Sequence, residues 1–189
     1  MPKKDAPVLP RRFIDEIRAT MPATHEIGGH MLSDRGHVIH DIQVFKGKPC
    51  RDAQGVRFRD AVCKIKKPDA KISFHTHPKS NRPSSSDLRN CVLKHPGING
   101  RGKRHTSVLF TPQGVWWYRP SSALVRAWRA REPRSEEVRR DMKRWSRFGR
   151  RYVERAARVG AYIRAMRAEG LRLRYVPYSE LSSTELSLR

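Results

Sequence analysis

Two histidines separated by one residue, His75 and His77, stand out in the stretch SFHTHPKSNRPSSSDL of residues 73–88. Successive side chains of a β-strand point to opposite faces of the sheet, so residues two apart share a face. Both imidazoles could then bind one zinc ion, whose bonds to histidine nitrogen are about 2.0–2.1 Å long. Alone, such a pair is weak evidence for a metal site, because short motifs recur by chance.

Asp87 lies ten residues after His77 and is a candidate third ligand. Ser84 and Asp87 also have the spacing of a capping box, which begins many ordinary helices. The intervening loop PKSNRP is short, so the first turn of that helix should stay near the end of the strand. Two histidines and one aspartate leave a fourth position for water, as a catalytic zinc requires. An Asp87 that binds metal is not expected to act fully as a cap.

A hydrolytic zinc site also needs a base for its water, and Glu26 is the candidate for that role. It occurs in the stretch HEIGGHML, an apolar and glycine-rich context in which a solvated surface glutamate is unexpected. The alternative is that Glu26 is an edge-strand residue paired with one of the many arginines.

A glutamate, then HTHP, then S-x-x-D occur in this order, and together they resemble the motif of the JAMM (MPN-plus) zinc metalloproteases. The resemblance implies an MPN domain with a cytidine-deaminase-like fold, which binds one catalytic Zn²⁺ through His75, His77 and Asp87. It also implies that Glu26 is the general base and that Ser84 helps to hold the oxyanion. The implied reaction is hydrolysis of an amide or isopeptide bond, often in a ubiquitin-like conjugate.

The resemblance covers residues 13–118 and leaves the C-terminal third outside. Five residues separate Pro78 from Ser84, one fewer than is commonest in the family, so a neighbouring serine of the run SSS is an alternative to Ser84.

Some MPN proteins lack the metal and serve as scaffold subunits. The alternative function is therefore a structural or binding protein in a nucleic-acid-containing particle such as a virion. A metal-dependent nuclease fits less well, because phosphodiester chemistry usually needs several carboxylates or two metals.

The residues before 121 predict a basic arm over residues 1–10 and one mixed α/β domain over residues 11–120. Helical apolar spacing predicts a first helix over residues 10–21, and SSSDLRNCVLKH predicts a second over residues 84–95. Alternating apolar residues and turn signals predict a curved, largely antiparallel sheet flanked by helices. Its expected strands are residues 25–32, 37–45, 56–65, 71–77, 106–112 and 114–120.

Residues 121–189 are expected to form an arginine-rich helical extension, with helices over residues 121–132 and 135–169. Residues 126–174 hold sixteen arginines and one lysine against six acidic residues, a net charge of +11. An apolar stripe at 4-3 spacing in the longer helix predicts packing on the domain or on a partner helix. The arginine faces predict contact with a polyanion, either a nucleic acid or an acidic protein surface, and are compatible with a place in a large assembly.

The whole chain of 189 residues carries a formal net charge of +23, which favours a polyanionic partner. Its three cysteines are widely spaced and form no CxxC pair, so small core residues in a reducing compartment are expected. No apolar run is long enough for a transmembrane helix, and the N-terminus lacks a secretory h-region. These features predict an intracellular protein of cytoplasm or nucleus, with a virion component also compatible.

Overall fold

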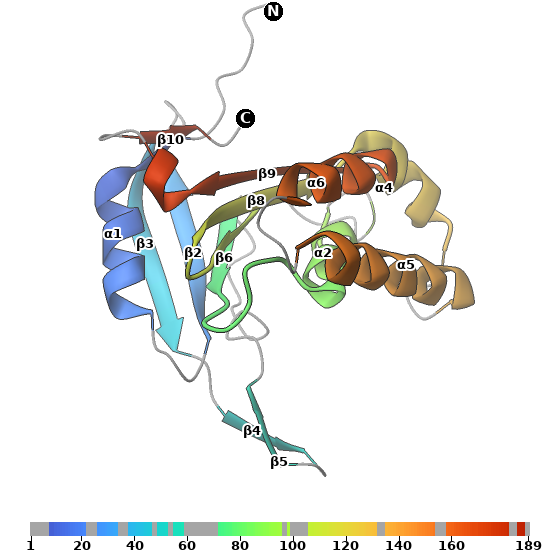
Figure 1. Cartoon of the computed structure of the whole chain (residues 1–189), viewed down its shortest axis with the longest axis horizontal. Coiled ribbons are helices and arrows are strands. Elements are labelled where there is room, and N and C mark those ends of the chain that lie inside the picture. The colour runs from blue at the N-terminus through green and yellow to red at the C-terminus, as the bar shows by residue number, and fades with distance from the viewer. Residues whose placement is uncertain are drawn as a thin grey trace, which may run out of the picture.

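The computed structural model describes residues 8–21, 26–33, 38–46, 49–52, 55–58, 72–95, 98, 106–131, 135–153, 158–181 and 185–187. A six-stranded sheet in the order β3-β2-β6-β7-β8-β9 forms its centre (Figure 1). Neighbouring strands are antiparallel except β6 and β7, which run parallel. This confirms the predicted mixed α/β class. The strands are β2 (Ile27–Ser33), β3 (Ile39–Lys46), β6 (Ile72–Thr76), β7 (Thr106–Phe110), β8 (Gly114–Pro120) and β9 (Leu171–Pro177).

Two small sheets accompany the large one. Strand β1 (Val8–Pro10) pairs with β10 (Glu185–Ser187), and β4 (Pro49–Asp52) pairs with β5 (Gly55–Phe58). The prediction of a loose arm over residues 1–10 is wrong for its last three residues, because Leu9 is fully buried and β1 is paired. Residues 1–7 lie outside the described part of the chain, as does most of the strand predicted over residues 56–65.

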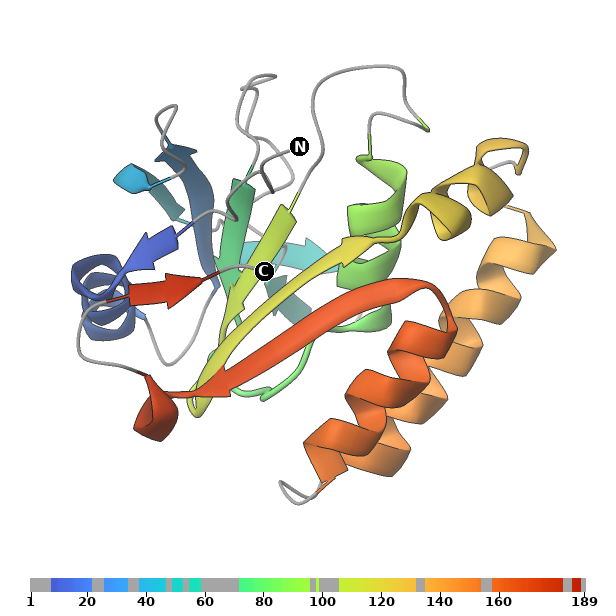
Figure 2. The ribbon, with the colours of Figure 1, turned by 90° about the horizontal axis from the view of Figure 1, so that it is seen from above.

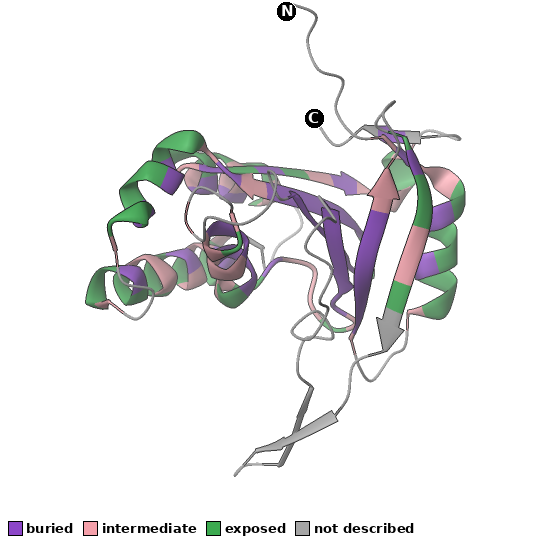
Figure 3. Cartoon of the chain, turned by 180° about the vertical axis from the view of Figure 1, so that it is seen from behind, coloured by how far each residue is buried: buried purple, intermediate pink, exposed green. Residues whose placement is uncertain are grey.

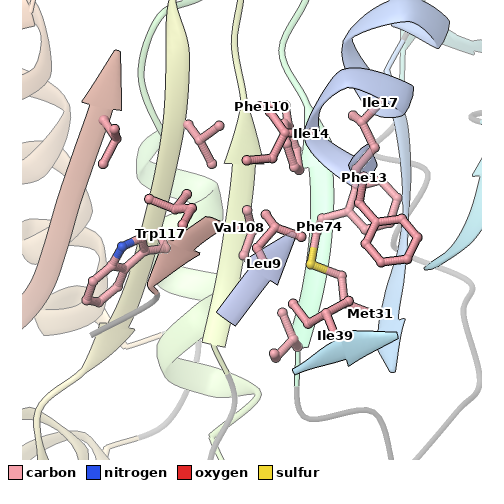
Figure 4. Close-up of a cluster of buried hydrophobic side chains, with 14 residues drawn as sticks. Leu9, Phe13, Ile14, Ile17, Met31, Ile39, Phe74, Val108, Phe110 and Trp117 are labelled. Carbon is pink, nitrogen blue, oxygen red and sulfur yellow. The ribbon is translucent and has the colours of Figure 1, made fainter. Parts of the chain in front are cut away.

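Helix α1 (Arg11–Thr20) covers one face of the sheet. Phe13, Ile14 and Ile17 recur at helical spacing and are buried there against sheet residues that include Phe74 and Val108 (Figure 4). The polar residues of α1 face outward, and Figure 3 shows this alternation of buried and exposed surface along the helix. The apolar stripe that predicted this helix is therefore the surface that fixes it to the sheet.

The other face of the sheet is covered by α2 (Ser85–Leu93), α4 (Ser122–Arg129), α5 (Glu136–Val153) and α6 (Val159–Ala168) (Figures 1 and 2). Trp128 of α4 and Trp145 of α5 stack there, with ring centroids 5.4 Å apart and planes 2° from parallel. The Trp128 indole N–H donates to Asp141 Oδ2 over 3.1 Å. The apolar side of these arginine-rich helices is thus part of the domain core.

The prediction of one long helix over residues 135–169 is wrong, because α5 and α6 are separate helices that lie side by side (Figure 2). The 4-3 spacing continues in phase across the break, so it does not distinguish one helix from two. A hairpin buries Val138 and Trp145 of α5 together with Tyr162 and Met166 of α6 in one core. In a single straight helix, about half of the apolar stripe would extend beyond the sheet and remain uncovered.

Strand β9 was not predicted, since residues 121–189 were expected to be helical. Gly170, with φ of 84°, turns the chain from α6 into β9, and β9 then pairs with β8 along its full length. Leu171 and Leu173 are buried while Arg172 and Arg174 are exposed, the alternation of a strand with one covered face. The arginine-rich segment therefore includes an edge strand of the main sheet.

Cys91 is a buried residue of α2, as expected of a small core residue. Its Sγ–H donates to the Tyr118 carbonyl over 3.6 Å, and burial raises the pKa of the thiol to about 12. A thiol held in this state is a poor nucleophile. The side chains of Cys50 and Cys63 lie outside the described residues. Among the described helices, none is long and apolar enough to cross a membrane.

We expect Gly29→Ala to lower the free energy of unfolding by about 1–3 kcal/mol or more. A Cβ at residue 29 would lie 1.8 Å from the Gln43 carbonyl oxygen and 2.7 Å from a Phe74 ring carbon, so strands β3 and β6 would have to move. Gly160→Ala is the matched control, because its nearest neighbour is an Arg164 guanidinium nitrogen at 3.6 Å. Chemical denaturation measures both; equal stability of the two variants would contradict the close strand approach.

Candidate metal centre

Strand β6 and helix α2 bring the predicted ligands together. His75 pairs with Gly28 of β2 and Leu109 of β7, so it lies in the middle of the sheet. His77 follows the end of β6, and its backbone N–H donates to the Phe110 carbonyl over 2.8 Å, which continues the strand geometry. Asp87 lies in the first turn of α2. The short loop thus returns the chain to the end of the strand, as the sequence predicted.

The ligand atoms of His75, His77 and Asp87 all lie within 4.8 Å of one another, and all three residues are buried. His75 Nε2 lies 3.4 Å from Asp87 Oδ1, and His77 Nε2 lies 3.3 Å from Asp87 Oδ2. Ligands about 2.0–2.2 Å from a tetrahedral zinc are about 3.3–3.6 Å apart. Each imidazole nitrogen therefore lies at such a separation from one of the two Asp87 oxygens, and the three residues could hold a metal ion.

The hydrogen bond of His77 identifies the nitrogen that faces Asp87. His77 Nδ1 lies 2.9 Å from the Arg82 carbonyl oxygen, and a carbonyl only accepts, so Nδ1 carries the proton. In a neutral imidazole Nε2 is then an acceptor, and it points at a carboxylate oxygen 3.3 Å away. Two acceptors at this distance repel unless a cation lies between them. A metal ion supplies that cation, and a second proton on His77 is the alternative. Histidines that bind a metal commonly donate their other ring N–H to a partner such as the Arg82 carbonyl.

Asp87 is both a helix cap and a candidate ligand. Its Oδ2 accepts from the Ser84 backbone N–H over 2.6 Å, while its Oδ1 faces His75. The capping box is complete, and Oδ1, which takes no part in it, is the oxygen that faces His75, whereas Oδ2 also faces His77. Burial alone would raise the pKa of Asp87, but the charge and hydrogen bonding of His75 and then His77 hold that pKa well below its usual value of 3.8. Asp87 is therefore a carboxylate at neutral pH.

Glu26 lies beside the candidate ligands and directly precedes β2. Its Oε1 is 3.6 Å from His77 Nε2, and its side chain is 23% exposed against 9% for His77. Thr76, the residue between the two histidines, fixes the neighbouring backbone: its Oγ1 accepts from Ile27 N–H at 2.9 Å and donates to the Ile27 carbonyl at 3.3 Å. The strand end that carries the two candidate histidine ligands therefore also positions the candidate base at the solvent side.

Ser84 is the N-cap of α2 and is exposed. Its Oγ accepts from the Asp87 backbone N–H over 3.1 Å, so the hydroxyl proton is not used in that contact. The structure therefore brings Ser84 to the rim of the site, next to the candidate ligand Asp87, while its role in the chemistry stays a prediction.

Sequence reasoning missed the residues that hold the loop between β6 and α2. The Trp116 indole N–H donates to the Asn81 carbonyl over 2.8 Å, and the Arg82 guanidinium lies against Gly149 of α5. These partners lie 35 and 67 positions away in the chain, and no local pattern links them. In the sequence, the place of Arg82 in the short loop after His77 is the feature that could have indicated a role near the site.

No protein-family model matches the chain, and no curated protein matches it in sequence. The class of the site therefore rests on its residues: a buried histidine, histidine and aspartate cluster with a glutamate beside it, compatible with a metal-dependent hydrolase.

Proposed function

We propose that the chain is a metal-dependent hydrolase of the JAMM type, with zinc bound by His75, His77 and Asp87. The observation that carries the proposal is that His77 Nε2, the ring nitrogen turned away from the Arg82 carbonyl, faces Asp87 Oδ2 at 3.3 Å in a buried site. Two nitrogens and one carboxylate oxygen are ligands that zinc prefers, and three protein ligands leave a position for water. Bound zinc would lower the pKa of that water to about 7 and polarise a carbonyl group.

Glu26 is the proposed general base. It lies at the solvent side of the ligands, within 3.6 Å of the metal-facing nitrogen of His77, so it can reach a water at the open position. It would accept the water's proton and later give it to the leaving amine. A lysine ε-amine is a poor leaving group unless it is protonated, so this second transfer is essential for an isopeptide bond.

Ser84 is proposed to stabilise the oxyanion of the tetrahedral intermediate. Its hydroxyl accepts from the Asp87 N–H, so its own proton can be donated to the developing charge. The N-terminus of α2 lies at the same place and adds positive potential. The substrate class proposed is an amide or isopeptide bond, in a ubiquitin-like conjugate or another protein, and the proposed location is intracellular.

The second candidate is a structural or binding protein of the same fold in a large nucleic-acid-containing assembly. The charge of +23 favours it, whereas the co-location of Glu26 with three candidate ligands favours the enzyme. A nuclease is disfavoured, because one ligand carboxylate and one base are too few for usual phosphodiester chemistry.

The test is cleavage of fluorogenic ubiquitin-like isopeptide and linear amide substrates by zinc-loaded protein, with a chelator-treated sample beside it. We expect turnover that the chelator removes and added zinc restores. A zinc-bound protein that cleaves none of these substrates while it binds nucleic acid would favour the structural alternative.

A further inference from the structure

Arginines face one another across the edge of the main sheet, between β8 and β9. Arg119 of β8 is the direct cross-strand partner of Arg172 of β9, and Trp117 is the partner of Arg174. Antiparallel partners project to the same face, and like charges directly opposite destabilise a sheet. The pairing therefore gathers guanidinium groups on one face of this edge, where an anion would be attracted.

A hollow of about 590 Å³ lies at this place, lined by Trp117, Arg119, Ser121, Arg167 and Arg172 together with apolar residues. We call it the basic hollow. Its lining holds three arginines and no aspartate or glutamate. Trp117, which also lines it, is buried, and its indole N–H has no hydrogen-bond partner among the described residues. Three cations without an acidic residue in the same lining indicate a binding place for an anion.

The row of arginines continues beyond the basic hollow. Arg164, exposed on α6, lies one turn before Arg167, and Arg174, exposed on β9, lies two residues beyond Arg172 on the same face. Helix and strand geometry space such residues about 5–7 Å apart. A row of cations of this spacing suits a polymer with a regularly repeated charge better than a single small anion.

We propose that the basic hollow and its flanking arginines bind the phosphate backbone of a nucleic acid. Arginine matches phosphate through its planar, bidentate donors. Trp117 belongs to the core cluster that also holds the buried residues of α1, whereas His75 lies beside Leu109 of the other cluster. No residue that lines the basic hollow is a candidate metal ligand, so nucleic-acid binding should not depend on metal. Sequence preference is not expected, because the contacts are to phosphates.

The experiment is a fluorescence-anisotropy titration of labelled mixed-sequence duplex and single-stranded oligonucleotides over a range of salt concentrations. For duplex, the logarithm of the association constant falls with the logarithm of the salt concentration, at a slope of about −0.9 per phosphate neutralised. The Arg119→Gln/Arg172→Gln variant loses two cations, so its slope should be shallower by about 2. The matched control is Arg126→Gln/Arg129→Gln, which removes the same charge from the exposed side of α4. Circular dichroism checks that both variants are folded.

Equal reductions in the affinity of the two double variants would overturn the assignment of the basic hollow. Binding that does not depend on salt would overturn phosphate recognition. A competition with poly-glutamate of matched charge separates the two kinds of partner. If poly-glutamate displaces the labelled oligonucleotide as effectively as unlabelled oligonucleotide does, the partner is an acidic protein, and the proposal is contradicted.

The loop before α2 carries a second inference, which rests on the proposed metal site. A Cβ at Gly149 would lie 1.9 Å from Arg82 Nη1 and 2.9 Å from its Cζ, so the guanidinium occupies the space that the glycine leaves on α5. Burial raises the pKa of the Tyr162 hydroxyl on α6, and the nearby positive charge of Arg82 lowers it. The same residue offers its carbonyl to His77 Nδ1. The geometry points to Arg82 and Gly149 as positioning residues, through which the α5–α6 hairpin orients a metal ligand.

Metal affinity, measured by competition between the protein and a chromophoric chelator for Zn²⁺, tests this inference. Arg82→Ala and Gly149→Ala should each weaken affinity about 10-fold, at the lower end of the 10–100-fold typical of outer partners of metal ligands. Gly160→Ala is the matched control, since it makes the same chemical change where the nearest neighbour, an Arg164 guanidinium nitrogen, is at an ordinary contact distance of 3.6 Å. Gly149→Ala displaces the end of a flexible side chain, so thermal unfolding of the metal-free protein should be unchanged or slightly raised.

The failures of the two proposals are distinguishable. Wild-type protein that binds zinc while all three variants bind it equally well would overturn the positioning role and leave the metal site standing. Wild-type protein that binds no zinc would overturn the metal site itself.

Discussion

Turnover of the Glu26→Gln variant is expected to be about 10²–10⁴-fold lower than that of the wild type, with zinc content and stability unchanged. Glutamine keeps the shape of the side chain but cannot accept the proton of the water. Glu26 is not among the three residues whose ligand atoms cluster within 4.8 Å, so its replacement leaves that cluster complete. Steady-state kinetics on an isopeptide substrate and metal analysis of the same sample measure the two effects.

Glu16→Gln is the matched control, because it makes the same chemical change on the exposed side of α1. Unchanged turnover in Glu26→Gln would mean that another group accepts the proton. Loss of zinc together with turnover would mean that Glu26 is a ligand and not a base.

The His77→Ala variant is expected to lose zinc, with an affinity reduced by more than the 10–100-fold typical of residues that only support a ligand. The change removes one of the three candidate ligand atoms. It also removes the hydrogen bond that His77 Nδ1 donates to the Arg82 carbonyl. Equilibrium dialysis with limiting zinc, followed by metal analysis, gives the number of ions per chain.

His40→Ala is the control for this experiment, since His40 is an exposed histidine of β3. It should bind zinc as the wild type does. Full zinc retention in His77→Ala, in a folded protein, would show that His77 is not a ligand.

The candidate site was predictable because its residues are close in sequence. An HxH pair on a strand, a short loop and a helix N-terminus fix the approximate positions of His75, His77 and Asp87 through local geometry alone. Glu26 was predicted from its unusual context, and the pairing of Gly28 with His75 then explains how it comes near the ligands. A complete capping box with the other Asp87 oxygen turned to His75 was not predicted, because it depends on which carboxylate oxygen faces which partner.

The C-terminal third was predicted less well. The stripe over residues 135–169 has the same phase in one helix or in two, so the break between α5 and α6 left no signal in the spacing. The alternation in LRLRYVP does indicate β9, but it follows directly on a helical pattern rich in arginine. The contact of Arg82 with Gly149 depends on tertiary packing, and local patterns carry no information about it.

The most direct measurement of the metal centre is an anomalous difference map, recorded at the zinc absorption edge from crystals grown with one equivalent of Zn²⁺. We predict one strong peak per chain, at about 2.0–2.2 Å from His75 Nε2, His77 Nε2 and an oxygen of Asp87. A well-ordered site without a peak, or a peak bound by other residues, would contradict the assignment.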